Sequence, residues 1–246
     1  MEAISQMLTL TYGGESVPYQ VIQVPGRTGK VAIHVYPDGS VQVDAPPETE
    51  VEEIRRAVQK RARWVMRHVA QALKQKEHVL PREYVSGESH FYLGRRHQLK
   101  VVPLEQGKES VKLSREQIKV ETITAAPEHI KALLGRWYRS RAAEYFAGRM
   151  KAIIPGISWV SEAPKWRLQI MKKQWGSCSP QGVITLNPHL VKAPRDCVDY
   201  VLVHELCHLV EHNHSVEFYR LLGGQIPGWE SVKAKLDGMA EKLLND

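Results

Sequence analysis

The sequence of 246 residues has few cysteines and no long apolar run. Its three cysteines, Cys178, Cys197 and Cys207, are odd in number and irregularly spaced, which favours reduced thiols over a disulfide framework. No stretch approaches the roughly eighteen apolar residues of a membrane span, and the first residues lack the basic and apolar parts of a signal peptide. We therefore expect a cytoplasmic protein without a membrane-spanning helix.

Glycine and proline are also modest, at 17 and 14 residues, so the composition is neither collagen-like nor of low complexity. Acidic residues are the minority, and the net charge is +7. Residues 131–173 hold ten Lys or Arg against two Glu, or +8, with Trp137 and Tyr138 among the arginines Arg136, Arg139, Arg141 and Arg149. This basic stretch could bind nucleic acid, but an amphipathic helix with solvated arginines is the favoured interpretation.

In the first half of the chain, apolar and polar residues alternate as they do in β-strands. Residues 31–36 and 40–44 flank a Pro-Asp-Gly turn and predict a β-hairpin. A helix is predicted to follow, with Thr49 as its N-cap and apolar residues on one face as far as Val69. Short strands are expected again near residues 91–93, 98–102, 111–113 and 118–120.

The second half is more helical. Pro127 opens a predicted helix that reaches about Met150, and Ala125-Ala126-Pro127 is the best candidate for a domain boundary. The sequence therefore predicts an α+β protein. Residues 1–125 would form a β-rich N-terminal region with one long helix, which could dock partners or regulate access to a site, and residues 126–246 would form a second domain.

The chemistry is concentrated in a buried helix after Pro194. Residues 195–210 are apolar on nearly every side, so burying two histidines and a glutamate there is costly unless a ligand compensates them. His204 and His208 are four residues apart and share one helix face, where both can bind one zinc ion. Glu205 then lies beside the metal, where it can take a proton from a zinc-bound water attacking a carbonyl.

A catalytic zinc needs a third protein ligand and one open position. Glu211 and His212 would lie about 10.5 and 12 Å along the axis from His204 if the helix continued, too far to share its metal. Asn213 tolerates the left-handed conformation that ends helices, so a turn there can bring His214 back to the ion. Ser215 can N-cap a further helix over residues 216–222.

Two other interpretations of these histidines remain. They could be core residues satisfied by hydrogen bonds, or ligands of a purely structural zinc, although Glu205 argues against the latter. The residue that would stabilise the developing oxyanion also stays open among Tyr219, His212 and Arg220.

Several motifs together resemble the YgjP-like metallopeptidases, relatives of the SprT-like proteins. The similarity is dense over residues 170–222 and looser upstream, and it rests on residues 175–179 (WGSCS), 184–187 (ITLN), Pro194, 199–201 (DYV), 204–208 (HELCH) and 213–215 (NHS). The ligand spacing is also that of metzincins, but those have a glycine where this chain has Glu211. The resemblance implies a zincin-like lobe, with helices packed on a mixed sheet, behind the β-rich N-terminal lobe.

The resemblance also implies a zinc metalloprotease with one zinc per chain, His204, His208 and His214 as ligands, and Glu205 as the catalytic residue. In zincins the substrate lies along an edge strand, which residues 169–175 and 183–187 could supply. Trp175 and Cys178 are then candidates for the substrate cleft, although packing explains both equally well. SprT-like relatives act on proteins attached to DNA, which suggests a nucleic-acid-associated protease as the alternative function.

Overall fold

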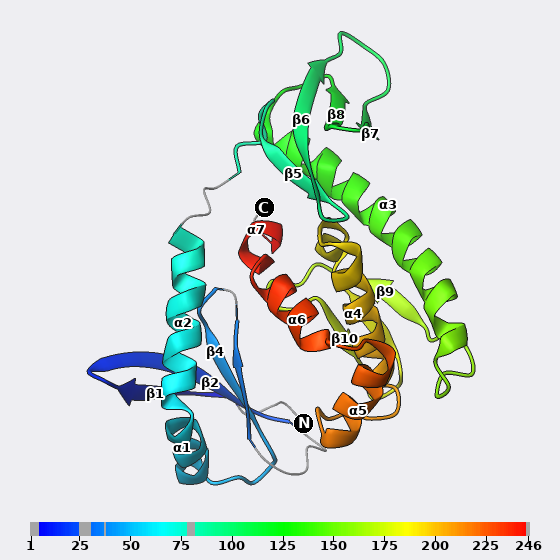
Figure 1. Cartoon of the computed structure of the whole chain (residues 1–246). Coiled ribbons are helices and arrows are strands. Elements are labelled where there is room, and N and C mark those ends of the chain that lie inside the picture. The colour runs from blue at the N-terminus through cyan, green and yellow to red at the C-terminus, as the bar shows by residue number, and fades with distance from the viewer. Residues whose placement is uncertain (1–4, 25–30, 37, 78–81, 245–246) are drawn as a thin grey trace. The chain divides into compact units, whose positions relative to one another are not determined.

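The computed structural model describes residues 5–24, 31–36, 38–77 and 82–244. It divides into two compact units, Met1–Leu80 and Pro81–Asp246. This division differs from the boundary expected after Ala125, because the strands between residues 89 and 122 share a core with the helices that follow them. Figure 1 shows the helices and strands of both units.

The first unit contains a four-stranded mixed sheet in the order β1-β2-β4-β3. Its strands are β1 (Ser5–Tyr12), β2 (Glu15–Gln23), β3 (Ala32–Val35) and β4 (Val41–Ala45). Strands β3 and β4 pair in antiparallel fashion, with Val35 opposite Val41, which confirms the expected hairpin. Pro37 of its turn lies outside the described residues.

The single helix predicted after this sheet is two helices, α1 (Val51–Lys60) and α2 (Ala62–Glu77). Helix α1 has Glu50 at its N-cap, whereas the expected cap, Thr49, donates its hydroxyl to the carbonyl oxygen of Pro46. The apolar face was predicted correctly, since it packs with the strands in one core. Its buried members are Ile54, Val58, Ala62, Val65 and Val69.

The second unit begins with another four-stranded sheet, in the order β5-β6-β8-β7, which has the same connectivity as the first. Its strands are β5 (Ser89–Tyr92), β6 (Arg95–Pro103), β7 (Ser110–Leu113) and β8 (Gln117–Thr122). Helix α3 (Pro127–Ile153) extends the prediction by one turn, and its apolar face packs with Leu99, Ile118 and Val120 of the sheet. This sheet and helix belong to the core that holds the candidate site.

A small third sheet, in the order β10-β11-β9, lies in the same core. It is formed by β9 (Trp166–Leu168), β10 (Gly176–Cys178) and β11 (Ile184–Leu186). The expected edge over residues 169–175 is not a strand, and β10 begins only at Gly176. Because a glycine starts it and a Ser-Pro-Gln-Gly turn follows, β10 is short.

Helices complete the second unit. They are η1 (Ile154–Gly156), η2 (Pro188–Lys192), α4 (Arg195–Cys207), α5 (Val216–Gln225), α6 (Trp229–Asp237) and α7 (Ala240–Leu244). Over the described residues the chain therefore has seven α-helices and three mixed sheets, which confirms the α+β class. Within that part of the chain, no helix is both long enough and apolar enough to cross a bilayer.

Candidate metal centre

Helix α4 is almost entirely buried, as its apolar sequence predicts. It starts directly after Pro194, whose carbonyl oxygen accepts the first helical hydrogen bond from Val198. Arg149 of α3 holds it through a two-pronged ion pair with Asp199, at 2.7 and 2.9 Å. Such a paired guanidinium fixes orientation as well as distance, so α4 is held in place beside α3.

Helix α4 ends at Cys207, three residues earlier than predicted. The indole nitrogen of Trp159 donates to the carbonyl oxygen of Leu206 at 3.1 Å, and the amide of Glu211 donates to the carbonyl oxygen of Cys207. These contacts satisfy carbonyl groups that a helix end leaves unpaired. Positive φ angles among the described non-glycine residues occur elsewhere, so Asn213 does not adopt the left-handed conformation expected of it.

The chain nevertheless returns to the helix as predicted, and α5 begins at Val216. The Ser215 hydroxyl accepts the amide hydrogen of Phe218 at 3.1 Å, which confirms Ser215 as the N-cap. Phe218 is fully buried, and its ring centroid lies 4.9, 4.6 and 4.6 Å from those of His204, His208 and His214. This phenylalanine, which the sequence did not single out, forms a floor beneath the three imidazoles.

The three histidines converge on one point. One ring nitrogen from each of His204, His208 and His214 lies within 4.8 Å of the others, and these residues could hold a metal ion. The Nε2 atoms of His204 and His214 are 3.1 Å apart. Two imidazole ligands of a tetrahedral zinc, each at about 2.0–2.1 Å, are separated by about 3.3 Å, so the observed spacing fits such an ion.

A backbone carbonyl determines which nitrogen of His208 is available. Its Nδ1 lies 3.0 Å from the carbonyl oxygen of Glu211. Because a carbonyl can only accept, Nδ1 carries the hydrogen and Nε2 keeps a lone pair for a metal. Glu211 thus contributes through its backbone, not through the side chain considered as a ligand.

The environment keeps the imidazoles of His204 and His208 neutral. Burial, helped by the nearby His214 and His208, lowers the pKa of His204 to about 2. Burial also lowers the pKa of His208. A neutral imidazole is the form that binds a metal, so at neutral pH these two rings can bind an ion without first losing protons.

Glu205 lies next to the ligands and is 4% exposed. Its Oε2 atom is buried and has no hydrogen-bond partner within the described residues. Burial raises the pKa of its carboxyl group to about 8. An unpaired buried carboxyl group is costly to the fold, and such groups are concentrated at functional sites.

Comparison with known proteins agrees with this arrangement. Residues 29–239 match the sequence profile of a family described as "YgjP-like, metallopeptidase domain". The chain belongs to the YgjP-like metallopeptidase family. The match spans most of both compact units and confirms the resemblance seen in the sequence motifs.

Two solved structures are similar to parts of this YgjP-like chain. One is the metallopeptidase zymogen jannalysin of Methanocaldococcus jannaschii, with 20% identity and a TM-score of 0.34, covering 37% of this chain and 92% of that chain. The other is the metallopeptidase zymogen abylysin of Pyrococcus abyssi, with 28% identity and a TM-score of 0.33, covering 42% and 96%. Among curated proteins, none matches the chain.

Trp175 and Cys178, the candidates for the cleft of the YgjP-like domain, flank or belong to β10. Both are partly buried and pack against the hydrophobic core. Burial, together with the nearby Glu205, raises the pKa of the Cys178 thiol to about 11, so the thiol stays protonated at neutral pH. A protonated thiol is a weak nucleophile, and a contact of either residue with substrate stays a prediction.

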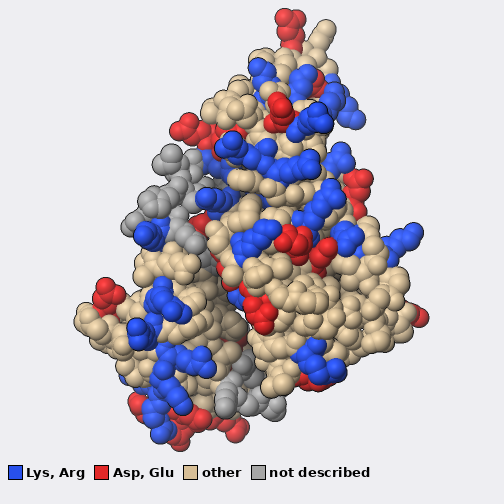
Figure 2. All heavy atoms as spheres, viewed as in Figure 1, with Lys and Arg blue, Asp and Glu red and all other residues tan. Residues whose placement is uncertain are grey.

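Much of the basic stretch of this YgjP-like chain lies in the amphipathic helix α3, which exposes Arg136 and Arg139, as the favoured interpretation predicted. Trp137 and Tyr138 are buried, and the Tyr138 hydroxyl donates to the carbonyl oxygen of Phe91. Arg141 pairs with Glu144. On the face shown in Figure 2, basic side chains are interspersed with acidic ones. Recruitment to nucleic acid stays a prediction, with no exposed Trp137 or Tyr138 for base stacking.

The three candidates for stabilising an oxyanion differ in their surroundings. The Tyr219 ring stacks on His214, with centroids 6.1 Å apart, and on Trp229, at 5.0 Å. Tyr219 is 41% exposed. Arg220 instead forms a two-pronged pair with Glu217. The stacking of Tyr219 on His214, a candidate metal ligand, favours Tyr219 over Arg220 and His212.

Proposed function

We propose that the protein is a zinc-dependent peptidase in which His204, His208 and His214 bind the ion and Glu205 acts as general base. The observation that carries this proposal is the convergence of three imidazole nitrogens within 4.8 Å beside a buried, unpaired carboxyl group. Three neutral nitrogen ligands suit zinc and leave its fourth position open. A structural zinc would need neither the open position nor Glu205.

When bound, the zinc ion would lower the pKa of a coordinated water and polarise the substrate carbonyl. Glu205 would accept the proton that this water loses and deliver it to the leaving amine. Burial raises the pKa of this carboxyl group to about 8, and the positive charge of a nearby ion would lower it and favour the carboxylate form that accepts the proton. Phe218 would exclude water from beneath the ligands.

Strand β10 supports a peptide as the substrate. It is an edge strand, and the two residues that flank it, Trp175 and Ser179, form backbone hydrogen bonds with Asn187 and Val183 on either side of β11. Gly176 and Cys178 alternate with them, so their N–H and C=O groups point away from β11. An extended peptide could pair with these groups, as in other cases of strand addition to a sheet edge.

The exchange Glu205→Gln tests the mechanism. The amide has the size of the carboxyl group but cannot accept the proton, so kcat should fall by about 10²–10⁴-fold while each chain still binds one zinc. Hydrolysis of a casein-derived peptide library followed by mass spectrometry would measure activity, and elemental analysis would measure zinc. Glu230→Gln, which changes an exposed acid on α6, is the matched control. Full activity in Glu205→Gln would contradict the proposed role.

A further inference from the structure

Gly176, the first residue of β10, lies directly against the carboxyl group of Glu205. A Cβ atom placed at Gly176 would meet Oε1, Cγ and Cδ of Glu205 at 2.6, 2.8 and 2.9 Å. All three distances are below 3.0 Å, the limit that real Cβ atoms essentially never pass. Any side chain at position 176 would therefore require the carboxyl group or the strand to move.

The backbone at this position does not itself require glycine. Gly176 is not among the described glycines with positive φ, so alanine could adopt its conformation. Gly94 is different, because its φ is +77° and a Cβ there would also meet the Pro194 backbone at 2.8 Å. What position 176 needs is therefore space, and the group that fills this space is the carboxyl group of Glu205.

Packing, more than hydrogen bonding, determines where this carboxyl group stands. Glu205 is 4% exposed, and its Oε2 atom has no hydrogen-bond partner among the described residues. No donor therefore holds that oxygen against a push from β10. A methyl group at position 176 would meet the end of a flexible side chain, which can shift without unfolding the surrounding core.

We propose that Gly176 is a positioning residue for the peptidase reaction: its lack of a side chain lets the Glu205 carboxyl group stand beside the three histidines. This inference rests on the proposed function, since the position matters only if Glu205 transfers the proton. It assigns to β10 a second role besides pairing with a peptide. The strand's first residue would fix the general base, and its outward backbone groups would hold the substrate.

The exchange Gly176→Ala tests this proposal in the full-length, zinc-loaded protein. Displacing a catalytic group by about 1 Å can cost about 100-fold, so kcat should fall by about that factor while KM changes less than about twofold. Zinc content should stay at one per chain. Gly135→Ala is the matched control, because it adds the same methyl group on the exposed side of α3, where a Cβ meets nothing within 4 Å. That control should keep wild-type kcat and KM.

A crystal structure of Gly176→Ala supplies a measurement that does not depend on activity, and we expect the Glu205 carboxyl group to be displaced by about 1 Å. A carboxyl group that has not moved, or a variant that has lost its zinc, would overturn the positioning role. A raised KM with unchanged kcat would also overturn it, because that pattern indicates weaker peptide pairing instead. A displaced carboxyl group with wild-type kcat would contradict the role of Glu205, and hence the proposed function.

Discussion

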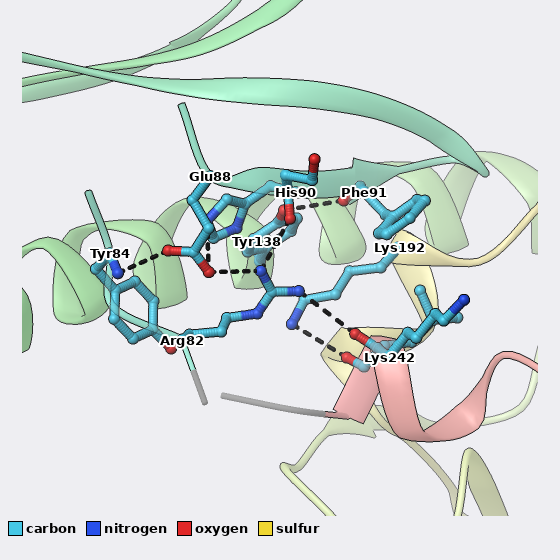
Figure 3. A network of polar contacts seen from close by, with 10 residues as sticks. Arg82, Tyr84, Glu88, His90, Phe91, Tyr138, Lys192 and Lys242 are labelled. Atoms are coloured by element: carbon cyan, nitrogen blue, oxygen red, sulfur yellow. Dashed lines mark hydrogen bonds and ion pairs between the residues drawn. The ribbon is translucent and has the colours of Figure 1, made fainter. Parts of the chain in front are cut away.

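The second unit contains two polar clusters that differ in how many hydrogen-bond partners the protein supplies to their polar groups. The first is the metal-centre cluster, formed by His204, Glu205, His208 and His214. The second, shown in Figure 3, is the C-terminal cluster, formed by Arg82, Glu88 and Lys192 around the end of helix α7. Each contains one buried charged residue, Glu205 or Lys192, so each pays the cost of removing a charged group from water. They differ in what replaces that water.

In the C-terminal cluster, oxygen atoms of the protein replace the water that would otherwise solvate the charged groups. The Arg82 guanidinium donates to Glu88 Oε1 and to the Ser89 carbonyl oxygen, each at 2.9 Å. Lys192 is 2% exposed and donates to the carbonyl oxygen of Leu243 at 3.2 Å. Its ammonium group also lies 5.0 Å from the centroid of the Tyr138 ring. Cations at the carbonyl end of α7 interact favourably with the helix dipole.

In the metal-centre cluster, the protein supplies fewer partners. Glu205 Oε2 and His204 Nδ1 are buried without hydrogen-bond partners among the described residues. The Nε2 atoms of His204 and His214 face each other, as two acceptors would around a shared cation. Buried charged groups with hydrogen-bond partners therefore stabilise the fold, whereas buried polar groups without such partners are available to a ligand and its reaction.

Removing a metal ligand should produce the largest effect. His208→Ala deletes one of the three nitrogens that would bind zinc. Loss of a residue that only hydrogen-bonds to a metal ligand lowers affinity by up to about 100-fold, so loss of the ligand itself should lower zinc affinity by more than that. Peptide hydrolysis should be lost with it. The melting temperature in excess chelator should fall only modestly, because the variant then loses the hydrogen bond to Glu211 and the packing on Phe218 but no ion. Zinc titration and calorimetry would measure both quantities.

The C-terminal cluster provides the contrasting control for that prediction, because Lys192→Met should keep zinc affinity and activity per folded molecule. If His208→Ala instead unfolded the chelated protein, the histidines would be structural, and the contrast between the two clusters would fail.

Breaking the C-terminal cluster should have an intermediate effect, on stability alone. Lys192→Met keeps most of the side-chain volume but leaves the Leu243 carbonyl oxygen without this donor, which should cost about 1–3 kcal/mol of unfolding free energy. Urea unfolding of the zinc-free protein would measure it. Lys242→Met is the matched control, because the Lys242 side chain is exposed and only its carbonyl oxygen meets Arg82, at 3.4 Å. Equal losses in both variants would show that Lys192 has no special role.

The sequence predicted those parts of the site that depend on local spacing. The four-residue interval from His204 to His208 fixes one helix face, and Ser215 precedes an amphipathic run, so both the pair and the cap followed from helix geometry. The sequence correctly predicted that a turn brings His214 back to the helix. It was wrong about the left-handed conformation of Asn213. At the early end of helix α4, Trp159, 47 residues upstream, donates to the carbonyl oxygen of Leu206.

What the sequence could not predict depends on contacts between distant segments. The carbonyl oxygen of Glu211, the floor formed by Phe218 and the fit of Gly176 on Glu205 have no signature in local residue pattern. The division at residues 80 and 81 was missed for a similar reason. Both halves of the expected N-terminal region alternate like strands, and only packing shows that the later strands share a core with α3.

A third polar cluster, at the surface, should show the smallest effect on stability when it is mutated. Its groups have hydrogen-bond partners but remain near water. Glu109 accepts hydrogen bonds from the Thr122 hydroxyl at 2.6 Å and the Ile123 amide at 3.0 Å, and lies 2.8 Å from His129 Nε2. The bond from Thr122, followed by those from His129 and Ile123, lowers the pKa of this carboxyl group from 4.5 to about 2. Its stabilising contribution is thus present above about pH 4.5 and is lost as the pH falls toward 2.

Glu109→Gln should therefore lower the melting temperature slightly at pH 6 and not at all near pH 2, so that the curves of melting temperature against pH converge in acid. Calorimetry from pH 2 to 6 would measure this. Glu105→Gln, an exposed acid on the same loop, should leave the shape of the curve unchanged. If the Glu109→Gln curve instead stayed parallel to that of the wild type, the carboxylate would contribute nothing through its charge. Hydrogen-bonded charged groups would then stabilise the fold only where they are also buried, as around Lys192.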